Sequence, residues 1–107
     1  LELARAQLQG HRAAQALATL ERSPGSPDRE ALQGAARTLL SEWPQAAEHY
    51  RRALESRPDD VALLNGLGWA LRQQGRAGEA RATFERSLQL QPAQPEIRGL
   101  LSPGAAR

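Results

Sequence analysis

The stretch Leu64-Asn65-Gly66-Leu67-Gly68-Trp69-Ala70-Leu71 organises the whole chain of 107 residues. Its leucines and its alanine recur at steps of three and four residues, which is the spacing that lines one face of an α-helix. This spacing predicts a helix over residues 61–74. Gly75 follows, and glycine accepts the left-handed backbone with which many helices end.

A second helix is predicted over residues 78–91. Ala80, Phe84 and Leu88 fall on one stripe of this helix. Pro92 ends it, because proline has no amide hydrogen to continue the helical hydrogen bonds. Two amphipathic helices joined by a short loop pack antiparallel, so the two predicted helices form one hairpin.

The residues that define the hairpin keep fixed spacings; they are Leu64, Leu67, Gly68, Leu71, Gly75, Ala80, Phe84 and Pro92. In this pattern the hairpin resembles the tetratricopeptide repeat. The signature of that repeat is a large residue, a Leu-Gly pair, another large residue, an alanine, an aromatic and a closing proline. Leucines replace the family's usual aromatics at residues 64 and 71, but the spacing is kept throughout.

The preceding segment repeats the same plan at the family's period of about 34 residues. The matched places are Gly34 with Gly68, Ala46 with Ala80, Tyr50 with Phe84, Ala53 with Ser87, and Pro58 with Pro92. Small residues let two helix backbones approach closely, and the aromatic fills the space beside them. We therefore predict that Tyr50 and Phe84 lie in the core. Such a unit cannot bury its apolar face alone, so neighbouring units must stack.

The resemblance implies an all-α fold, a right-handed α-solenoid of antiparallel helix pairs with about two and a half to three repeats and a C-terminal helix. The expected division of this one continuous domain is a partial repeat at 1–26, repeats at 27–60 and 61–94, and a C-terminal capping helix and tail at 95–107. Good helix formers dominate the composition, which agrees with this fold. The chain opens inside a predicted helix without a starting Met, so we expect it to be a fragment of a longer protein.

The N-terminal repeat is predicted to contain the end of a helix at residues 1–9, a turn at Gly10-His11 and a second helix at 12–22. The inward residues of that second helix are expected to be Ala13, Ala16, Leu17 and Leu20. At the other end of the chain, residues 95–101 are predicted to start a helix that covers the last hairpin. Ser102-Pro103-Gly104 is expected to end it.

The repeat at 27–60 departs from the family's pattern in its first helix, where Glu30, Gln33 and Arg37 occupy places that are normally apolar. Its second helix is predicted to open at Trp43-Pro44, with Trp43 packed between repeats. Two i, i+4 charge pairs are expected on the solvated surface of this second helix, Glu48 with Arg52 and Arg51 with Glu55.

Charge and composition exclude several classes of partner and site. The 14 positions counted as Lys or Arg are all arginine, yet the net charge is only +2, and no segment concentrates it enough for nucleic-acid binding. There is no run of about 20 apolar residues, so no direct membrane insertion is expected. The absence of cysteine excludes disulfides and Cys-type zinc sites. The compartment stays open, with bacterial cytoplasm and periplasm both compatible.

No catalytic constellation is visible in the sequence. His11 and His49 are the only imidazoles, and neither has a cysteine or a paired carboxylate framework around it, so both are expected to be solvated surface residues. Gly66-Leu67-Gly68 is not a nucleotide loop, because Leu71 replaces the third glycine and no strand precedes it. We therefore predict no enzyme activity, no metal and no cofactor.

Partner binding is the function that the resemblance implies. In the family, the first helix of each hairpin lines a concave groove that accepts a peptide or a partner helix. Carried over to this chain, the groove residues are Ala31, Ala35, Thr38, Ala62, Asn65, Trp69 and Arg72. An amide can bond a peptide backbone, an indole can bury an apolar side chain, and a guanidinium can grip a carboxylate. The alternative for Trp69 is packing beneath a neighbouring helix.

The family's chaperone-tail binders place an asparagine directly before the Leu-Gly pair, together with lysines and arginines. Gly66 stands at that place here and lysine is absent, so a clamp for chaperone tails is not expected.

Three hypotheses for function remain open. The favoured one is a non-catalytic protein–protein interaction module, an adaptor or scaffold in the assembly of a larger complex. The second is a structural spacer or a segment that self-associates through its solenoid ends, as in proteins that resemble bacterial secretion, pilus or polysaccharide-export factors. The third is the docking region of an enzyme whose active site lies elsewhere.

Overall fold

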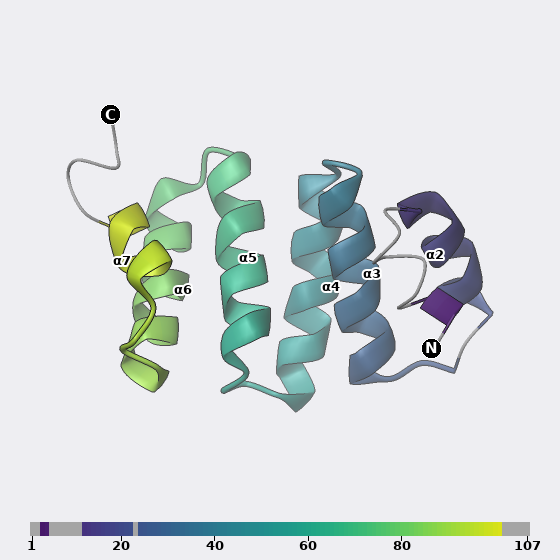
Figure 1. Ribbon diagram of the computed structural model, residues 1–107, viewed down its shortest axis with the longest axis horizontal. Helices are drawn as coiled ribbons and strands as arrows, with labels where there is room; N and C mark the ends of the chain where they lie inside the picture. Colours follow the sequence, from purple (N-terminus) through teal and green to yellow (C-terminus); the bar gives the residue numbers. More distant parts are fainter. Residues whose placement is uncertain (1–2, 5–11, 23, 102–107) are drawn as a thin grey trace.

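The structure is a computed structural model, and it describes residues 3–4, 12–22 and 24–101. Within these residues the secondary structure is helical and contains no strand, which confirms the all-α fold. The helices are α2 (Ala13–Glu21), α3 (Pro27–Leu39), α4 (Trp43–Ser56), α5 (Val61–Gln73), α6 (Ala77–Leu90) and α7 (Pro95–Leu101). They stand in chain order along the longest axis, and each packs on the next one (Figure 1).

The helices recur at one period. Each first helix begins 34 residues after the previous one, at Pro27, Val61 and Pro95. The second helices, α4 and α6, repeat at the same interval in both their first and last residues. The first helices α3 and α5 also contact each other directly. The chain is therefore a helical repeat protein in which the described part continues into a third first helix, α7.

The helix ends follow from local chemistry. The Ser26 hydroxyl accepts a hydrogen bond from the Arg29 amide at 3.0 Å, and the Asp60 carboxylate accepts one from the Leu63 amide at 3.1 Å. Both are N-cap contacts, which satisfy amides that have no partner inside the helix. Gly75 has a φ of 78°, the left-handed backbone predicted for the end of α5. The predicted bounds of α5 and α6 are each correct to within one residue.

The core is built around two aromatic rings, as predicted. Phe84 is 2% exposed and Tyr50 is 9% exposed. A Cβ atom added at Gly34 would lie 3.0 Å from the Tyr50 ring, and one added at Gly66 would lie 2.6 Å from it. A Cβ atom at Gly68 would lie 2.7 Å from the Phe84 ring. The Tyr50 ring therefore contacts α3 and α5 at once, and glycine is what allows this approach.

The two ends of the described chain agree with the sequence analysis where they can be compared. The four predicted inward residues of α2 are all buried. Ile97, Leu100 and Leu101 of α7 are partly buried against the core. The predicted turn at Gly10-His11, most of the helix end at 1–9 and the tail from residue 102 lie outside the described residues.

The start of α4 and the apolar character of the helices complete the description of the fold. Trp43 is half-buried at the start of α4, and its packing between repeats stays a prediction. Within the described ranges, none of the helices has both the length and the apolar character needed to cross a membrane.

Candidate partner-binding face

The seven predicted groove residues lie on the two first helices that contact each other, α3 and α5. We call them the first-helix face; α3 carries Ala31, Ala35 and Thr38, and α5 carries Ala62, Asn65, Trp69 and Arg72. Ala62 and Trp69 are exposed, and the other five are partly exposed. On the opposite side of α5, Leu64, Leu67 and Leu71 are buried. The helix therefore separates an apolar buried stripe from a mixed accessible one.

Trp69 and Arg72 form the most distinctive pair on this face. The Arg72 guanidinium carbon lies 5.7 Å from the centroid of the Trp69 ring, which is cation–π geometry. The indole keeps 38% of its surface exposed. Among the described residues no carboxylate pairs with Arg72, whereas most of the other arginines of α4 to α6 make ion pairs. The face thus presents an accessible indole beside a cation that has no carboxylate partner within the described chain.

Asn65 is held by a polar network that sequence reasoning missed. The Ser87 hydroxyl donates to the Asn65 side-chain oxygen at 2.6 Å, and the Asn65 amide donates to the Gln94 side-chain oxygen at 2.7 Å. The Gln94 amide in turn donates to the Ser87 hydroxyl at 3.0 Å. Ser87 is fully buried and Gln94 is 7% exposed. The network joins α5, α6 and the segment before α7.

The position of Ser87 was the only sequence signal for this network. It is a hydroxyl residue at the place where the preceding hairpin has Ala53. A buried hydroxyl needs a hydrogen-bond partner, but sequence alone does not identify that partner.

The α3 part of the face is small and closely tied to the core. Ala31 packs against the main core cluster, and the Thr38 hydroxyl donates to the Gly34 carbonyl at 2.9 Å. Burial raises the pKa of the Tyr50 phenol above its usual value of about 10, and a hydrogen bond with Thr38 acts in the opposite direction. Thr38 thus lies where the face meets the buried ring.

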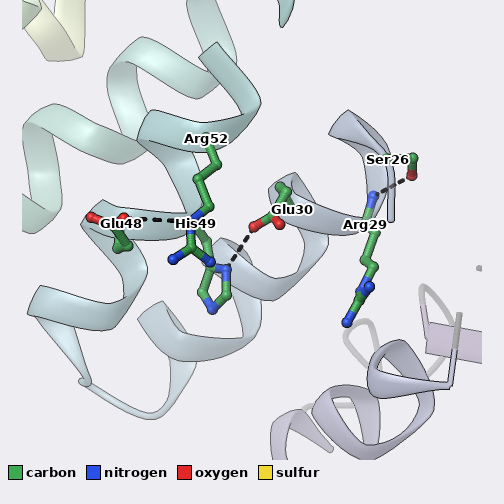
Figure 2. A network of polar contacts seen from close by, with 6 residues as sticks. All are labelled: Ser26, Arg29, Glu30, Glu48, His49 and Arg52. Atoms are coloured by element: carbon green, nitrogen blue, oxygen red, sulfur yellow. Dashed lines mark hydrogen bonds and ion pairs between the residues drawn. The ribbon is translucent and has the colours of Figure 1, made fainter. Parts of the chain in front are cut away.

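His49 differs from its prediction. It was expected to be a solvated surface residue, but its side chain is only 15% exposed, and its Nδ1 lies 2.8 Å from Glu30 Oε2. Figure 2 shows Glu30 reaching from α3 to the His49 ring on α4. The expectation was wrong because the carboxylate comes from the facing helix, 19 residues away in sequence. Within the described ranges, no group of three or more candidate ligands could hold a metal ion.

The two predicted surface pairs of α4 had different outcomes. Glu48 and Arg52 pair along the helix at 3.4 Å, as predicted (Figure 2). Arg51 instead lies 3.7 Å from Glu79 of α6, so its predicted pairing with Glu55 is wrong. The neighbouring hairpin places a carboxylate within reach, and such a partner cannot be identified from the sequence of one helix.

Comparisons with known proteins agree with the architecture. A family described as "Tetratricopeptide repeat" matches residues 39–95, from the end of α3 to the start of α7. "Protein O-mannosyl-transferase Tmtc2" from Drosophila melanogaster is 41% identical to the chain over 59 residues. That match covers 54% of this chain and 6% of the relative, so the chain spans only a small part of the length of that protein.

Proposed function

Since the chain belongs to the tetratricopeptide repeat family, whose domains are protein–protein interaction modules, we propose that its first-helix face binds a peptide or helix of a partner protein. In this proposal the domain catalyses no reaction of its own and serves as an adaptor or scaffold in a larger complex. The observation that carries the proposal is the exposed Trp69 beside Arg72.

The chemistry of this pair suits protein recognition. Tryptophan and arginine are enriched at the centres of protein interfaces, because each offers a large contact area together with a directional polar group. Removing the exposed part of the indole from water would stabilise a complex. The Arg72 guanidinium, which pairs with no carboxylate among the described residues, can bind a partner carboxylate through two parallel hydrogen bonds. A partner segment with an apolar side chain next to an acidic one fits both groups.

The rest of the face supports a shallow contact with an extended or helical segment. Ala31, Ala35 and Ala62 have small side chains, so a partner backbone can approach α3 and α5 closely. The Asn65 amide uses one donor and one acceptor within the fold. An asparagine side chain has two donors and can accept more than one bond, which leaves capacity for a partner backbone. Asn65 is therefore oriented by the fold before a partner arrives.

The test is affinity capture of partners with the domain, comparing the wild type with Trp69→Ala/Arg72→Ala. A matched control is Leu90→Ala/Arg22→Ala, which removes one exposed apolar side chain and one exposed arginine away from the face. All three proteins are first checked for equal helicity and melting temperature. Any captured partner is then purified and its affinity measured directly.

We expect the purified partner to bind the wild type and the control equally and the face variant at least about tenfold more weakly. Equal affinity for all three proteins would show that the first-helix face does not bind the partner.

A second candidate is a structural or self-associating segment of a longer solenoid. It is favoured by α7, which begins in register with α3 and α5 and presents the start of a further repeat. Under this alternative, sedimentation shows self-association that rises with concentration and does not change in the Trp69→Ala/Arg72→Ala variant.

A further inference from the structure

The dipeptide Asn65-Gly66 of α5 combines a chemically reactive sequence with a fixed position in the fold. Asn65 is the one asparagine of the chain, and glycine follows it directly. Asparagine before glycine is especially prone to spontaneous deamidation, because glycine has no side chain that hinders attack by its backbone nitrogen on the asparagine side chain. Asn65 is partly exposed, so water can reach it. The dipeptide therefore has the chemistry of a modification site.

Deamidation at such a dipeptide needs only water as a second reactant. The backbone nitrogen of Gly66 forms a bond with Cγ of Asn65 and loses its proton, while the bond from Cγ to Nδ2 breaks and ammonia leaves. Water then opens the cyclic imide at either of its carbonyl groups, which gives aspartate or isoaspartate. The net change replaces a side-chain amide by a carboxyl group, and the isoaspartate form also routes the main chain through the former side chain.

Tertiary packing explains why glycine follows the asparagine. A Cβ atom added at Gly66 would lie 2.6 Å from the Tyr50 ring, so a larger residue would force the ring or α5 to shift. The equivalent residues of the α3–α4 hairpin are Ala31 and Leu32, which do not form a reactive dipeptide. The packing of the Tyr50 ring thus places the reactive sequence in α5.

The fold holds Asn65 away from this reaction in two ways. Gly66 lies in the middle of α5, and in an α-helix each backbone amide donates to the carbonyl four residues before it. The Asn65 side chain is also bonded at both polar atoms, Oδ1 to the Ser87 hydroxyl at 2.6 Å and Nδ2 to Gln94 Oε1 at 2.7 Å. Ser87 and Gln94 are themselves buried and bonded to each other. The reaction therefore requires Asn65 to leave this network and α5 to open locally.

We propose that Asn65 is a deamidation site that its bonds to Ser87 and Gln94 keep closed, and that it reacts when the joint between α5, α6 and α7 opens. An ionised aspartate accepts hydrogen bonds but donates none, so the product loses the bond to Gln94 Oε1. The Gln94 carbonyl accepts the Arg98 amide at 3.0 Å, at the start of α7. Deamidation therefore loosens the start of α7. No step of the reaction involves a partner protein, so its occurrence does not depend on binding at the first-helix face.

The first measurement follows deamidation by mass spectrometry of the proteolytic peptide that carries Asn65, after incubation of the folded protein at mildly alkaline pH. Gln94→Ala removes the acceptor of Asn65 Nδ2, and Gln73→Ala is a matched control at an exposed place on α5. We expect Gln94→Ala to deamidate about fivefold faster than the wild type, and Gln73→Ala to deamidate at the wild-type rate. Equal rates in the wild type and Gln94→Ala would overturn the proposal.

Two references separate local opening from other causes. A synthetic peptide of residues 61–70 with capped ends reports the rate without the fold, and the wild type should deamidate at least about tenfold more slowly than this peptide. Glu30→Leu removes the contact with His49 in the α3–α4 hairpin, away from the network, and should deamidate at the wild-type rate. Equal rates in the peptide and the wild type would show that the fold does not close the site. A rate in Glu30→Leu as high as in Gln94→Ala, at comparable loss of stability, would assign the reaction to global unfolding. Either result would overturn the proposal.

The consequence for α7 is tested with Asn65→Asp, which introduces the carboxylate directly. Backbone hydrogen exchange of residues 95–101 should be about fivefold faster in this variant than in the wild type, because the bond from residue 65 to Gln94 is lost. Exchange in α3 should not change. Equal exchange of α7 in the two proteins would contradict the proposed loosening.

Discussion

The α3–α4 and α5–α6 hairpins share one backbone plan, but their helices are held together by different interactions. Glu30, Gln33 and Arg37 of the first hairpin correspond, at the 34-residue interval, to Leu64, Leu67 and Leu71 of the second. The three leucines are buried. Two of the polar residues make side-chain contacts instead: Glu30 is hydrogen-bonded to His49 and Arg37 forms an ion pair with Glu42, both at 2.8 Å. The same helical geometry thus tolerates either solution, although the Nε atom of Arg37 is buried without a hydrogen-bond partner among the described residues.

The difference predicts that the two hairpins respond to different perturbations. The free energy gained by burying leucine is non-directional and roughly proportional to the apolar area buried, so small shifts of the helices change it little. A partly buried ion pair depends on both partners, and removal of one leaves the other desolvated. The α5–α6 hairpin should therefore be sensitive to lost volume and the α3–α4 hairpin to lost partners.

The largest loss of stability is expected on replacing Phe84, the buried aromatic residue of the α5–α6 hairpin. Phe84→Ala should lower the free energy of unfolding by about 3–5 kcal/mol, because the ring is almost completely buried and its removal leaves a cavity. Denaturant unfolding followed by circular dichroism measures this loss. A change below the precision of that measurement would mean that Phe84 is not a core residue.

Glycine replacements at equivalent places compare how tightly the two rings are packed. A Cβ atom meets Phe84 at 2.7 Å in Gly68→Ala and Tyr50 at 3.0 Å in Gly34→Ala. We expect Gly68→Ala to cost about 1–3 kcal/mol through overpacking. Gly34→Ala should cost less, because the gain in helix propensity of up to about 1 kcal/mol offsets a milder contact.

Gly78→Ala is the control for this comparison, since its Cβ atom meets nothing within 4 Å. It should be neutral or stabilising by at most about 1 kcal/mol in the same unfolding measurement. A larger loss in Gly34→Ala than in Gly68→Ala would contradict the difference in packing.

Polar residues of the α3–α4 hairpin can be replaced by the residues that stand at the equivalent places of the α5–α6 hairpin. Leu64 and Thr83 stand where Glu30 and His49 stand in the first hairpin. Glu30→Leu alone should destabilise by about 1 kcal/mol, because it leaves a largely buried imidazole without its carboxylate. Glu30→Leu/His49→Thr should recover most of that loss, because both partners of the pair are then replaced and no imidazole is left without its carboxylate. A double-mutant cycle by denaturant unfolding measures the coupling, and a double variant less stable than the sum of the single changes would refute this view.

The smallest expected effect concerns the one hydroxyl that distinguishes Tyr50 from Phe84. Burial raises the pKa of this phenol in the folded state. The unfolded chain therefore loses the proton first, and stability should fall as the pH rises above about 10. The chain contains no lysine or cysteine and one tyrosine, and arginine loses its proton only at higher pH. A single phenol thus accounts for the side-chain titration in this window.

Thermal unfolding of the wild type and of Tyr50→Phe between pH 8 and about 11.5 checks this assignment. The alkaline loss of stability should be present in the wild type and absent in Tyr50→Phe. An equal loss in both proteins would mean that the phenol is not the responsible group.

Most of the fold could be predicted because its signals are local. The three- and four-residue spacing of leucines and the left-handed Gly75 act within a few residues of where they stand. The candidate site was less accessible to sequence reasoning. Its helical stripe could be predicted, but the bonds from Asn65 to Ser87 and Gln94 span 22 and 29 residues, and no local rule identifies such partners.

The sequence by itself determined the helices, their 34-residue period and the aromatic core, because periodicity and repeated small residues are properties of the chain itself. Only the tertiary structure decided which polar groups meet. The pairing of His49 with Glu30 and the contact of Arg51 with Glu79 arise where one helix faces another. These contacts depend on distances and directions between elements, which composition and spacing along the chain do not specify.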